Sequence, residues 1–187
     1  MQLSLRRLSV ANAALFCLLA GLAVRSFAQN RSMLPRMGTP VFQHLTRNAG
    51  YIFSGTVTAV SMIEPGSRNS LGATQITFHV ENAFRGVRKG QTLVIREWAG
   101  LWQAGEHYRV GERVTLFLFA PGKLGLTSPV GRQLGRFQLD PYGRVLLNRE
   151  HISAISTDPA LASRWQGKNQ ITWKEFSRAI QHEIQEY

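Results

Sequence analysis

Hydrophobic positions fall in short runs over most of the chain and follow a helical spacing only near the C-terminus. The most apolar of these runs, residues 114–119, lies between Gly111-Glu112 and Pro121-Gly122, both of which favour turns. A run of this length with branched and aromatic side chains is typical of a strand that is buried on both faces. We therefore expect the other strands to be arranged around residues 114–119.

Several other segments have the patterning of strands. Residues 74–80 alternate strictly between apolar and polar side chains, which predicts a half-buried strand. Gly55, inside the first strand, predicts a bulge or a sharp bend. Asp140-Pro-Tyr-Gly143 has the preferred residues of a type I turn and predicts a hairpin. The predicted strands are residues 51–60, 74–80, 92–98, 114–119, 136–139 and 145–147.

Two segments are predicted to be helical. Residues 41–48 are long enough for one or two helical turns with one apolar side. Near the C-terminus, Thr172 is followed three residues later by Glu175, which is the pattern of a capping box. The apolar spacing that follows predicts an amphipathic helix over residues 173–185, with its apolar stripe packed on the body of a β-barrel or on its end.

These elements predict a mainly β fold, a small five- to six-stranded barrel that is closed or partly open. A short N-terminal helix precedes the barrel and the C-terminal amphipathic helix follows it. A β-sandwich is the alternative, because strand number and turn spacing do not separate the two architectures. We assign residues 29–40 to a linker, 41–150 to the barrel domain and 151–187 to a C-terminal extension.

Residues 1–28 have the three parts of a secretory signal peptide. Arg6 and Arg7 form the positive end, residues 10–24 are apolar, and Ser26-Phe-Ala28 places small residues where a signal peptidase cleaves. We expect cleavage between Ala28 and Gln29 and an exported protein, periplasmic or secreted. The alternative is an uncleaved signal anchor; no membrane span is predicted in the mature chain.

Cysteine content and charge narrow the classes of function. The single cysteine, Cys17, lies in the leader, so the mature chain has no thiol for catalysis and no disulfide. The net charge is +11, and it is +8 without the first 28 residues, which contain three arginines and no acid. This excess keeps an exported protein soluble or attracts an anionic partner. The basic residues are scattered, which argues against nucleic acid.

The sequence predicts no cofactor and no metal site, because no nucleotide-binding, metal-binding or nucleophile motif is present and the five histidines are dispersed. Glu97 and Glu112 flank the loop over residues 99–107, and as a carboxylate pair they would suit a hydrolase. More often, such residues are strand-end charges or partners of Arg96 and Arg113.

The loop over residues 99–107 is the candidate binding site, because aromatic residues gather in it and at its ends. Such side chains either stack on a ligand or plug the end of a barrel. We predict that Trp102 is the more exposed tryptophan and that Trp98 is the more buried one. The candidate binding residues are Trp98, Trp102, His107 and Tyr108.

The strand-and-turn pattern over residues 50–140 resembles a family of uncharacterised exported bacterial proteins, which are similar to netrin-like domains and tissue inhibitors of metalloproteinases. The segments that carry the resemblance are Gly55-Thr-Val, Ile76-Thr-Phe-His-Val-Glu-Asn-Ala-Phe-Arg-Gly, Tyr108-Arg-Val-Gly-Glu-Arg-Val-Thr-Leu-Phe-Leu, Leu126-Thr-Ser-Pro-Val-Gly and Gly135-Arg-Phe-Gln-Leu. The resemblance implies a five-stranded oligonucleotide/oligosaccharide-binding (OB) barrel. Those inhibitors chelate zinc through an amino-terminal cysteine and are rich in disulfides, which the mature chain cannot reproduce.

From the sequence we therefore expect an exported, non-enzymatic binding module. Its ligand is either an anionic component of the cell envelope or a protein partner. The alternative is a hydrolase of the cell envelope that uses a carboxylate pair. A cleft that holds Glu97 or Glu112 with a second carboxyl or histidine within reach would favour the hydrolase, and an exposed groove without such a pair would favour the binding module.

Overall fold

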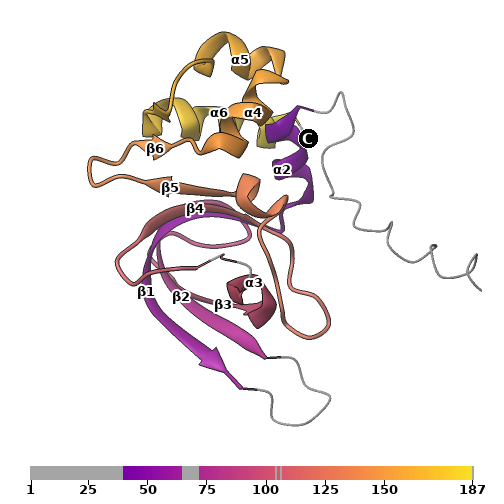
Figure 1. The fold of residues 1–187 in the computed structure, drawn as a ribbon, viewed down its shortest axis with the longest axis vertical. Helices are drawn as coiled ribbons and strands as arrows, with labels where there is room; N and C mark the ends of the chain where they lie inside the picture. The colour runs from indigo at the N-terminus through magenta and orange to yellow at the C-terminus, as the bar shows by residue number, and fades with distance from the viewer. Residues whose placement is uncertain (1–39, 65–71, 104, 106, 187) are drawn as a thin grey trace, which may run out of the picture. The chain divides into compact units, whose positions relative to one another are not determined.

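The computed structural model describes residues 40–64, 72–103, 105 and 107–186, within a compact unit that comprises Pro35–Tyr187. These residues form a mainly β fold, with one antiparallel sheet of seven strands and several helices (Figure 1). The expected leader and nearly all of the expected linker lie outside the described residues. Among the described residues, no helix is both long enough and apolar enough to cross a membrane.

The strands follow the order β3-β2-β1-β4-β5-β6-β7 across the sheet. Each predicted strand is present, although β1 and β2 are longer than expected and β7 is an addition. The strands are β1 (Tyr51–Ile63), β2 (Ala73–Arg85), β3 (Thr92–Trp98), β4 (Arg113–Leu118), β5 (Arg136–Leu139), β6 (Val145–Leu146) and β7 (Gln170–Ile171).

Both predicted helices, α2 (Val41–Asn48) and α6 (Trp173–Gln185), have the bounds expected from the sequence. The capping box of α6 is confirmed, since the Thr172 side chain accepts from Glu175 N and the Glu175 side chain accepts from Thr172 N. The other helical segments were not predicted: α3 (Ala99–Gln103), η1 (Arg132–Gly135), α4 (Arg149–Ser156) and α5 (Pro159–Trp165).

The pairing of the long strand β1 is irregular at Gly55, where the sequence predicted a bulge or a bend. Its pairing with β2 shifts register between Ser54 and Gly55, which marks an irregularity of the bulge type. A Cβ atom on Gly55 would overlap the carbonyl oxygen of His79 in β2. Only glycine therefore allows the two backbones to approach this closely.

The sheet is not closed, because β3 and β7 form its two edges. The segment after β4 nevertheless reaches both β4 and the edge of β3. Val130 N donates a hydrogen bond to Phe117 O in β4 at 2.7 Å, and Thr127 N donates to Arg96 O in β3 at 2.8 Å. Residues 127–130 thus cover part of the gap between the two strands.

Strand β4 is buried on both faces, which confirms the prediction for the central strand. Val114, Leu116 and Leu118 pack into a cluster inside the curled part of the sheet. On the opposite face, Phe117 packs into a second cluster, which includes residues from α2, α4, α5 and α6. β4 is therefore shared between two hydrophobic cores.

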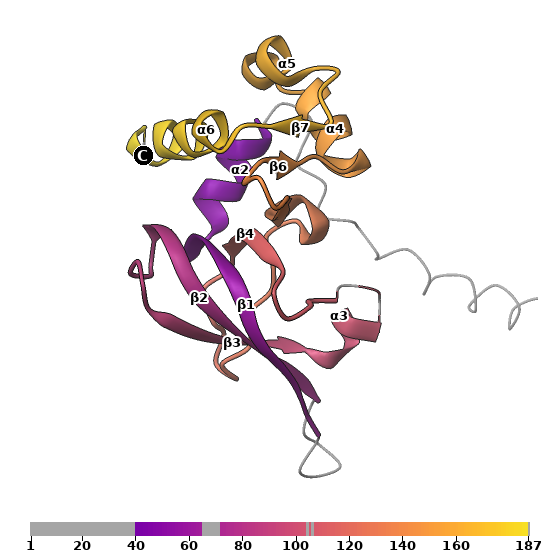
Figure 2. The same ribbon diagram turned by 90° about the vertical axis from the view of Figure 1, so that its left-hand side faces the viewer.

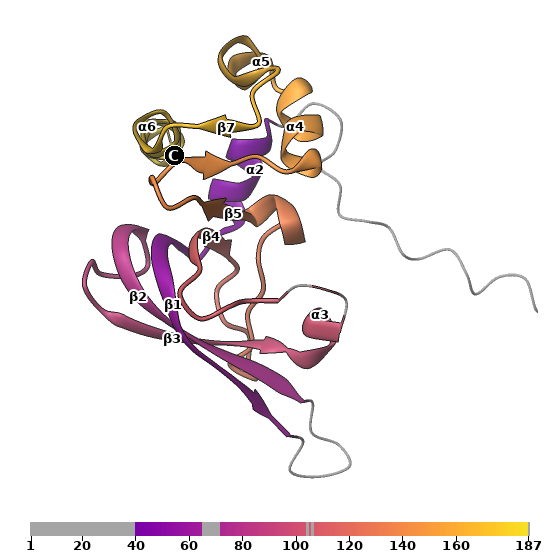
Figure 3. The same cartoon turned by 60° about the vertical axis from the view of Figure 1, so that its left-hand side comes forward.

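The helices α2, α4, α5 and α6 gather beside the β5–β7 part of the sheet, whereas α3 lies beside β3 (Figures 2 and 3). Aromatic rings fill the space between the helices and the sheet. The ring centre of Phe42 in α2 lies 5.5 Å from that of Phe176 in α6 and 6.0 Å from that of Phe117 in β4. The segment from residue 151 onward thus contributes to the same core as α2.

Candidate functional site

The two tryptophans of the candidate loop have the reverse of the predicted exposure. Trp98 is 51% exposed, whereas Trp102 is only partly exposed and packs against the cluster inside the curled sheet. The prediction was wrong because Ile95 and Glu97 are the buried residues of β3, so Trp98 points to the outer face with Val94. Helix α3 begins directly after β3 and brings Trp102 back toward the core.

His107 and Trp102 lie side by side at the edge of this core. Their ring centres are 4.6 Å apart, and the two planes are inclined by 50°. His107 is exposed, whereas the neighbouring Tyr108 is only 3% exposed. The structure therefore brings Trp102, His107 and Tyr108 together and separates Trp98 from them on the outer face of β3.

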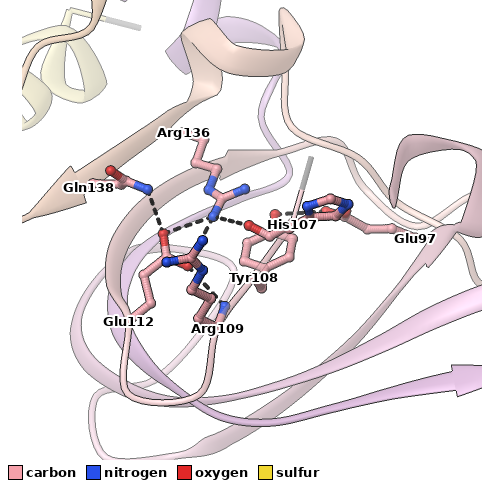
Figure 4. Close-up of polar contacts among 7 residues, drawn as sticks. All are labelled: Glu97, His107, Tyr108, Arg109, Glu112, Arg136 and Gln138. Carbon is pink, nitrogen blue, oxygen red and sulfur yellow. Dashed lines mark hydrogen bonds and ion pairs between the residues drawn. The ribbon is translucent and has the colours of Figure 1, made fainter. Parts of the chain in front are cut away.

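Tyr108 links three parts of the fold (Figure 4). Its hydroxyl donates a hydrogen bond of 3.0 Å to the carboxylate of Glu97, which is itself only 2% exposed. The ring packs edge-on against Phe78, with centres 5.8 Å apart. The guanidinium carbon of Arg136 lies 4.1 Å from the ring centre, which is cation–π geometry. These contacts make Tyr108 a structural residue of the core.

Arg136 in β5 is 7% exposed and joins the loop before β4 to the sheet. Its Nη2 donates to both carboxylate oxygens of Glu112, at 2.8 and 3.0 Å, and to the carbonyl oxygen of His107 at 2.6 Å. Gln138, two residues along β5, donates to the same carboxylate at 2.8 Å. The negative charge of Glu112 is therefore neutralised within the fold (Figure 4).

The structure does not bring Glu97 and Glu112 together as a carboxylate pair. They lie on opposite sides of Tyr108 in Figure 4, one bonded to the tyrosine hydroxyl and the other to Arg136. A hydrolase that uses a carboxylate pair needs both carboxylates within reach of the same substrate bond. Glu97 and Glu112 do not supply such a pair.

An open groove of about 610 Å³ lies between the loop before β4 and the β5–β6 hairpin. His107 is the only one of the four sequence-predicted binding residues that lines it. Arg109, which the sequence analysis did not single out, also lines the groove. The described residues that line the groove are Gly105, His107, Arg109, Gly111, Glu112, Arg113, Gln138, Leu139, Asp140, Pro141 and Leu146.

The acidic side chains at the described groove are matched by arginines. Arg144 bonds the Asp140 carboxylate at 2.6 Å, as Arg136 bonds Glu112. Arg113 bonds the carboxylate of Glu81 at 2.8 Å. Burial raises the pKa of Glu81, but the hydrogen bonds from Arg113 and Thr56 outweigh it, so the pKa lies below its ordinary value. The Glu81 carboxylate is therefore ionised at neutral pH.

Among the described residues of the groove, Arg109 is a cation whose side chain is not matched by a carboxylate. Its backbone N–H donates to Glu112 at 3.1 Å, but its exposed side chain has no ion-pair or hydrogen-bond partner within the described part of the chain. An exposed guanidinium beside neutralised carboxylates presents five donors to a ligand. The groove is thus suited to an anionic group.

One group of potential metal ligands occurs among the described residues, at the C-terminal end of α6. Ligand atoms of His182, Glu183 and Glu186 lie within 4.8 Å of one another. His182 and Glu186 are exposed, and exposed acidic groups of this kind are common without a metal. We assign no function to this group.

Comparisons with models of protein families and with curated proteins gave no match for this chain.

Proposed function

We propose that this protein is an exported, non-enzymatic binding module whose groove receives an anionic group of its ligand. One observation carries the proposal: among the described residues, the Arg109 guanidinium has no partner, in a groove where Glu112 and Asp140 are already matched by arginines. The overall positive charge of the chain favours the approach of such a ligand. His107 and its neighbour Trp102 lie beside the groove and add polar and aromatic surface.

Export is part of the proposal and depends on the signal-peptide pattern of residues 1–28. Expression in a bacterial host followed by mass spectrometry of the extracytoplasmic fraction tests it. The expected mature amino terminus is Gln29. Full-length protein recovered only from the soluble cytoplasm would contradict export without affecting the groove.

We further propose that the curled part of the sheet is an OB-like barrel. The support is that β1 pairs with both β2 and β4, while residues 127–130 contact β4 and the free edge of β3. This arrangement fits the resemblance to netrin-like domains. The mature chain lacks cysteine, so zinc chelation by an amino-terminal cysteine is not part of the proposal.

The test of the groove is binding to dextran sulfate, a soluble polyanion, with neutral dextran as the reference. We expect the mature protein to bind dextran sulfate only. Arg109→Gln should weaken binding by about tenfold or more, since a hydrogen bond to a charged group contributes roughly 1.5–3 kcal/mol.

Arg164→Gln is the matched control, because Arg164 is exposed on α5 and its loss removes the same charge outside the groove. Arg164→Gln should change the affinity for dextran sulfate less than about twofold, because salt screens a single exposed charge that lies outside the groove. Equal weakening by both substitutions would mean that the whole charged surface binds the polymer, and the groove would lose its assignment.

A further inference from the structure

Two turns flank the groove, and each carries an exposed apolar side chain at its tip. Val110, in the turn over residues 109–112, is 66% exposed, and Tyr142, in the turn over residues 140–143, is 85% exposed. The residues next to them, Arg109, Gly111 and Pro141, line the groove. The apolar tips and Arg109 therefore belong to one surface.

The turn over residues 109–112 holds Val110 away from the core. Glu112 N donates to Arg109 O at 2.9 Å, and Gly111 has a φ of +86°, which suits the third position of a type II turn. Val57 in β1 fixes this turn through two backbone hydrogen bonds, of 2.8 Å from Gly111 and 2.9 Å to Glu112. These hydrogen bonds fix the backbone of the turn, which holds the Val110 side chain in an exposed position.

The second turn is held by Asp140. Its carboxylate accepts hydrogen bonds from Tyr142 N at 2.9 Å and from Arg144 N at 2.8 Å, and its carbonyl accepts from Gly143 N at 2.9 Å. The guanidinium of Arg144 lies 5.2 Å from the centre of the Tyr142 ring. The exposed ring therefore has a cation close beside it.

Leu146 extends the apolar rim of the groove, since it is 37% exposed and lines the side that the β5–β6 hairpin forms. We call Val110, Pro141, Tyr142 and Leu146, together with Arg109, the tip surface. An anionic polymer in water makes no use of apolar side chains on protruding turns. A lipid bilayer does, because headgroup phosphates and the edge of the hydrocarbon lie next to each other.

We propose that the tip surface docks on an anionic lipid bilayer. Val110 and the Tyr142 ring enter the boundary between headgroups and acyl chains, where an amphipathic aromatic ring is favoured. Arg109 contacts a lipid phosphate, which is the anionic group assigned to the groove, so this inference rests on the proposed function. The hydrogen bonds within both turns satisfy several of the backbone groups that approach the lipid.

The experiment uses the mature full chain and co-sedimentation with vesicles of phosphatidylcholine, with and without 30% phosphatidylglycerol. We expect binding to the anionic vesicles only. Val110→Asp and Tyr142→Asp should each lower the partition coefficient about tenfold or more, because each replaces an inserted apolar group by a charge. Circular dichroism should show that both variants remain folded, since both side chains are exposed.

Leu124→Asp is the matched control. Leu124 is 73% exposed, so the substitution changes charge and exposed apolar surface in the same way. It lies in the connection after β4, whereas the tip surface lies where β4 begins and β5 ends. Loss of vesicle binding in Leu124→Asp to the same degree would overturn the proposal.

Binding to vesicles and binding to dextran sulfate test the membrane proposal and the anionic groove separately. If the protein binds dextran sulfate through Arg109 but neither kind of vesicle, the membrane proposal is wrong and the anionic groove stands. If Val110→Asp and Tyr142→Asp lose vesicle binding but keep dextran sulfate binding, the membrane proposal is supported. If vesicles are bound equally by these two variants and the unaltered chain, the tip surface does not dock on lipid.

Discussion

The guanidinium of Arg136 lies over the ring of Tyr108, 4.1 Å from its centre, so that one charged group of β5 covers the loop that leads into β4. The same guanidinium bonds Glu112 and is only 7% exposed. Arg136→Met leaves the Glu112 carboxylate without its cation. We expect a loss of about 3–5 kcal/mol in the free energy of unfolding, as for other broken buried pairs.

Urea denaturation measures this loss, and Arg113→Met is the control. Arg113 also bonds a carboxylate at 2.8 Å, that of Glu81, but its side chain is 36% exposed. Because exposed ion pairs contribute roughly 0–1 kcal/mol, the control should be nearly neutral. A similar effect of both substitutions would show that the Arg136 network is not a special part of the fold.

Single-tryptophan variants test the exposure of the two loop tryptophans. Trp98, half exposed on the outer face of β3, should be quenched by iodide more strongly than Trp102, which packs against the core. A third variant that keeps only Trp165, which is 2% exposed, gives the reference for a buried ring. Stronger quenching of Trp102 than of Trp98 would contradict the orientation of β3.

Truncations on the two faces of β4 test whether this strand is shared by two cores. Leu116→Ala and Phe117→Ala each remove a fully buried side chain, one from each cluster. Each should lower the free energy of unfolding by about 2–5 kcal/mol. Val94→Ala, at a half-exposed position of β3, should cost less than about 1 kcal/mol. If truncation of Leu116 or Phe117 left the free energy of unfolding nearly unchanged, that face of β4 would be exposed to solvent.

Acid should destabilise the protein through His151. Its ring is 3% exposed and stacks on Phe137, with centres 4.0 Å apart. Burial lowers the pKa of His151 from 6.5 to about 4, although nearby carbonyl groups act in the opposite direction. The unfolded chain therefore binds the proton more readily. The free energy of unfolding should fall by about 3 kcal/mol as the pH decreases from about 6.5 to 4.

Denaturation at a series of pH values, with His151→Phe as the comparison, isolates this contribution. The variant keeps an aromatic ring against Phe137 and has no group that titrates, so its stability should change less over the same interval. His79→Gln, which removes an exposed histidine, should behave like the unaltered chain. An unchanged pH profile in His151→Phe would show that other groups cause the dependence.

The sequence predicted the strands well because each is bounded by turn residues and has its own short apolar pattern. It did not predict α4, whose capping box pairs Asn148 with His151 instead of the usual Glu or Gln. Helix α5 was not predicted either, although the sequence contains a signal for its start: Asp158 caps the helix and Pro159 occupies its first turn. Strand β7 has only two residues, too few for any alternation to appear.

The groove was less predictable, because its parts meet only through long-range pairing. Alternation along β3 puts Trp98 on the same side as Val94, but it does not tell which side faces the core. Glu97 takes the inner side because the Tyr108 hydroxyl hydrogen-bonds to its carboxylate. Arg136 reaches Glu112 only because β5 lies antiparallel to β4, and nothing in the local sequence specifies that partner.

The contact between Phe42 in α2 and Phe176 in α6 joins the first and last helices of the described chain. Closing a loop that contains nearly the whole domain carries a large entropic cost before the contact can form. During synthesis, Phe42 can pack against Phe117 in β4 before α6 exists, but the side of Phe42 that faces Phe176 has no cover until the last helix has been made. A protein shortened before Trp173 should leave this side of the Phe42 ring in water, and we expect it to be prone to aggregation.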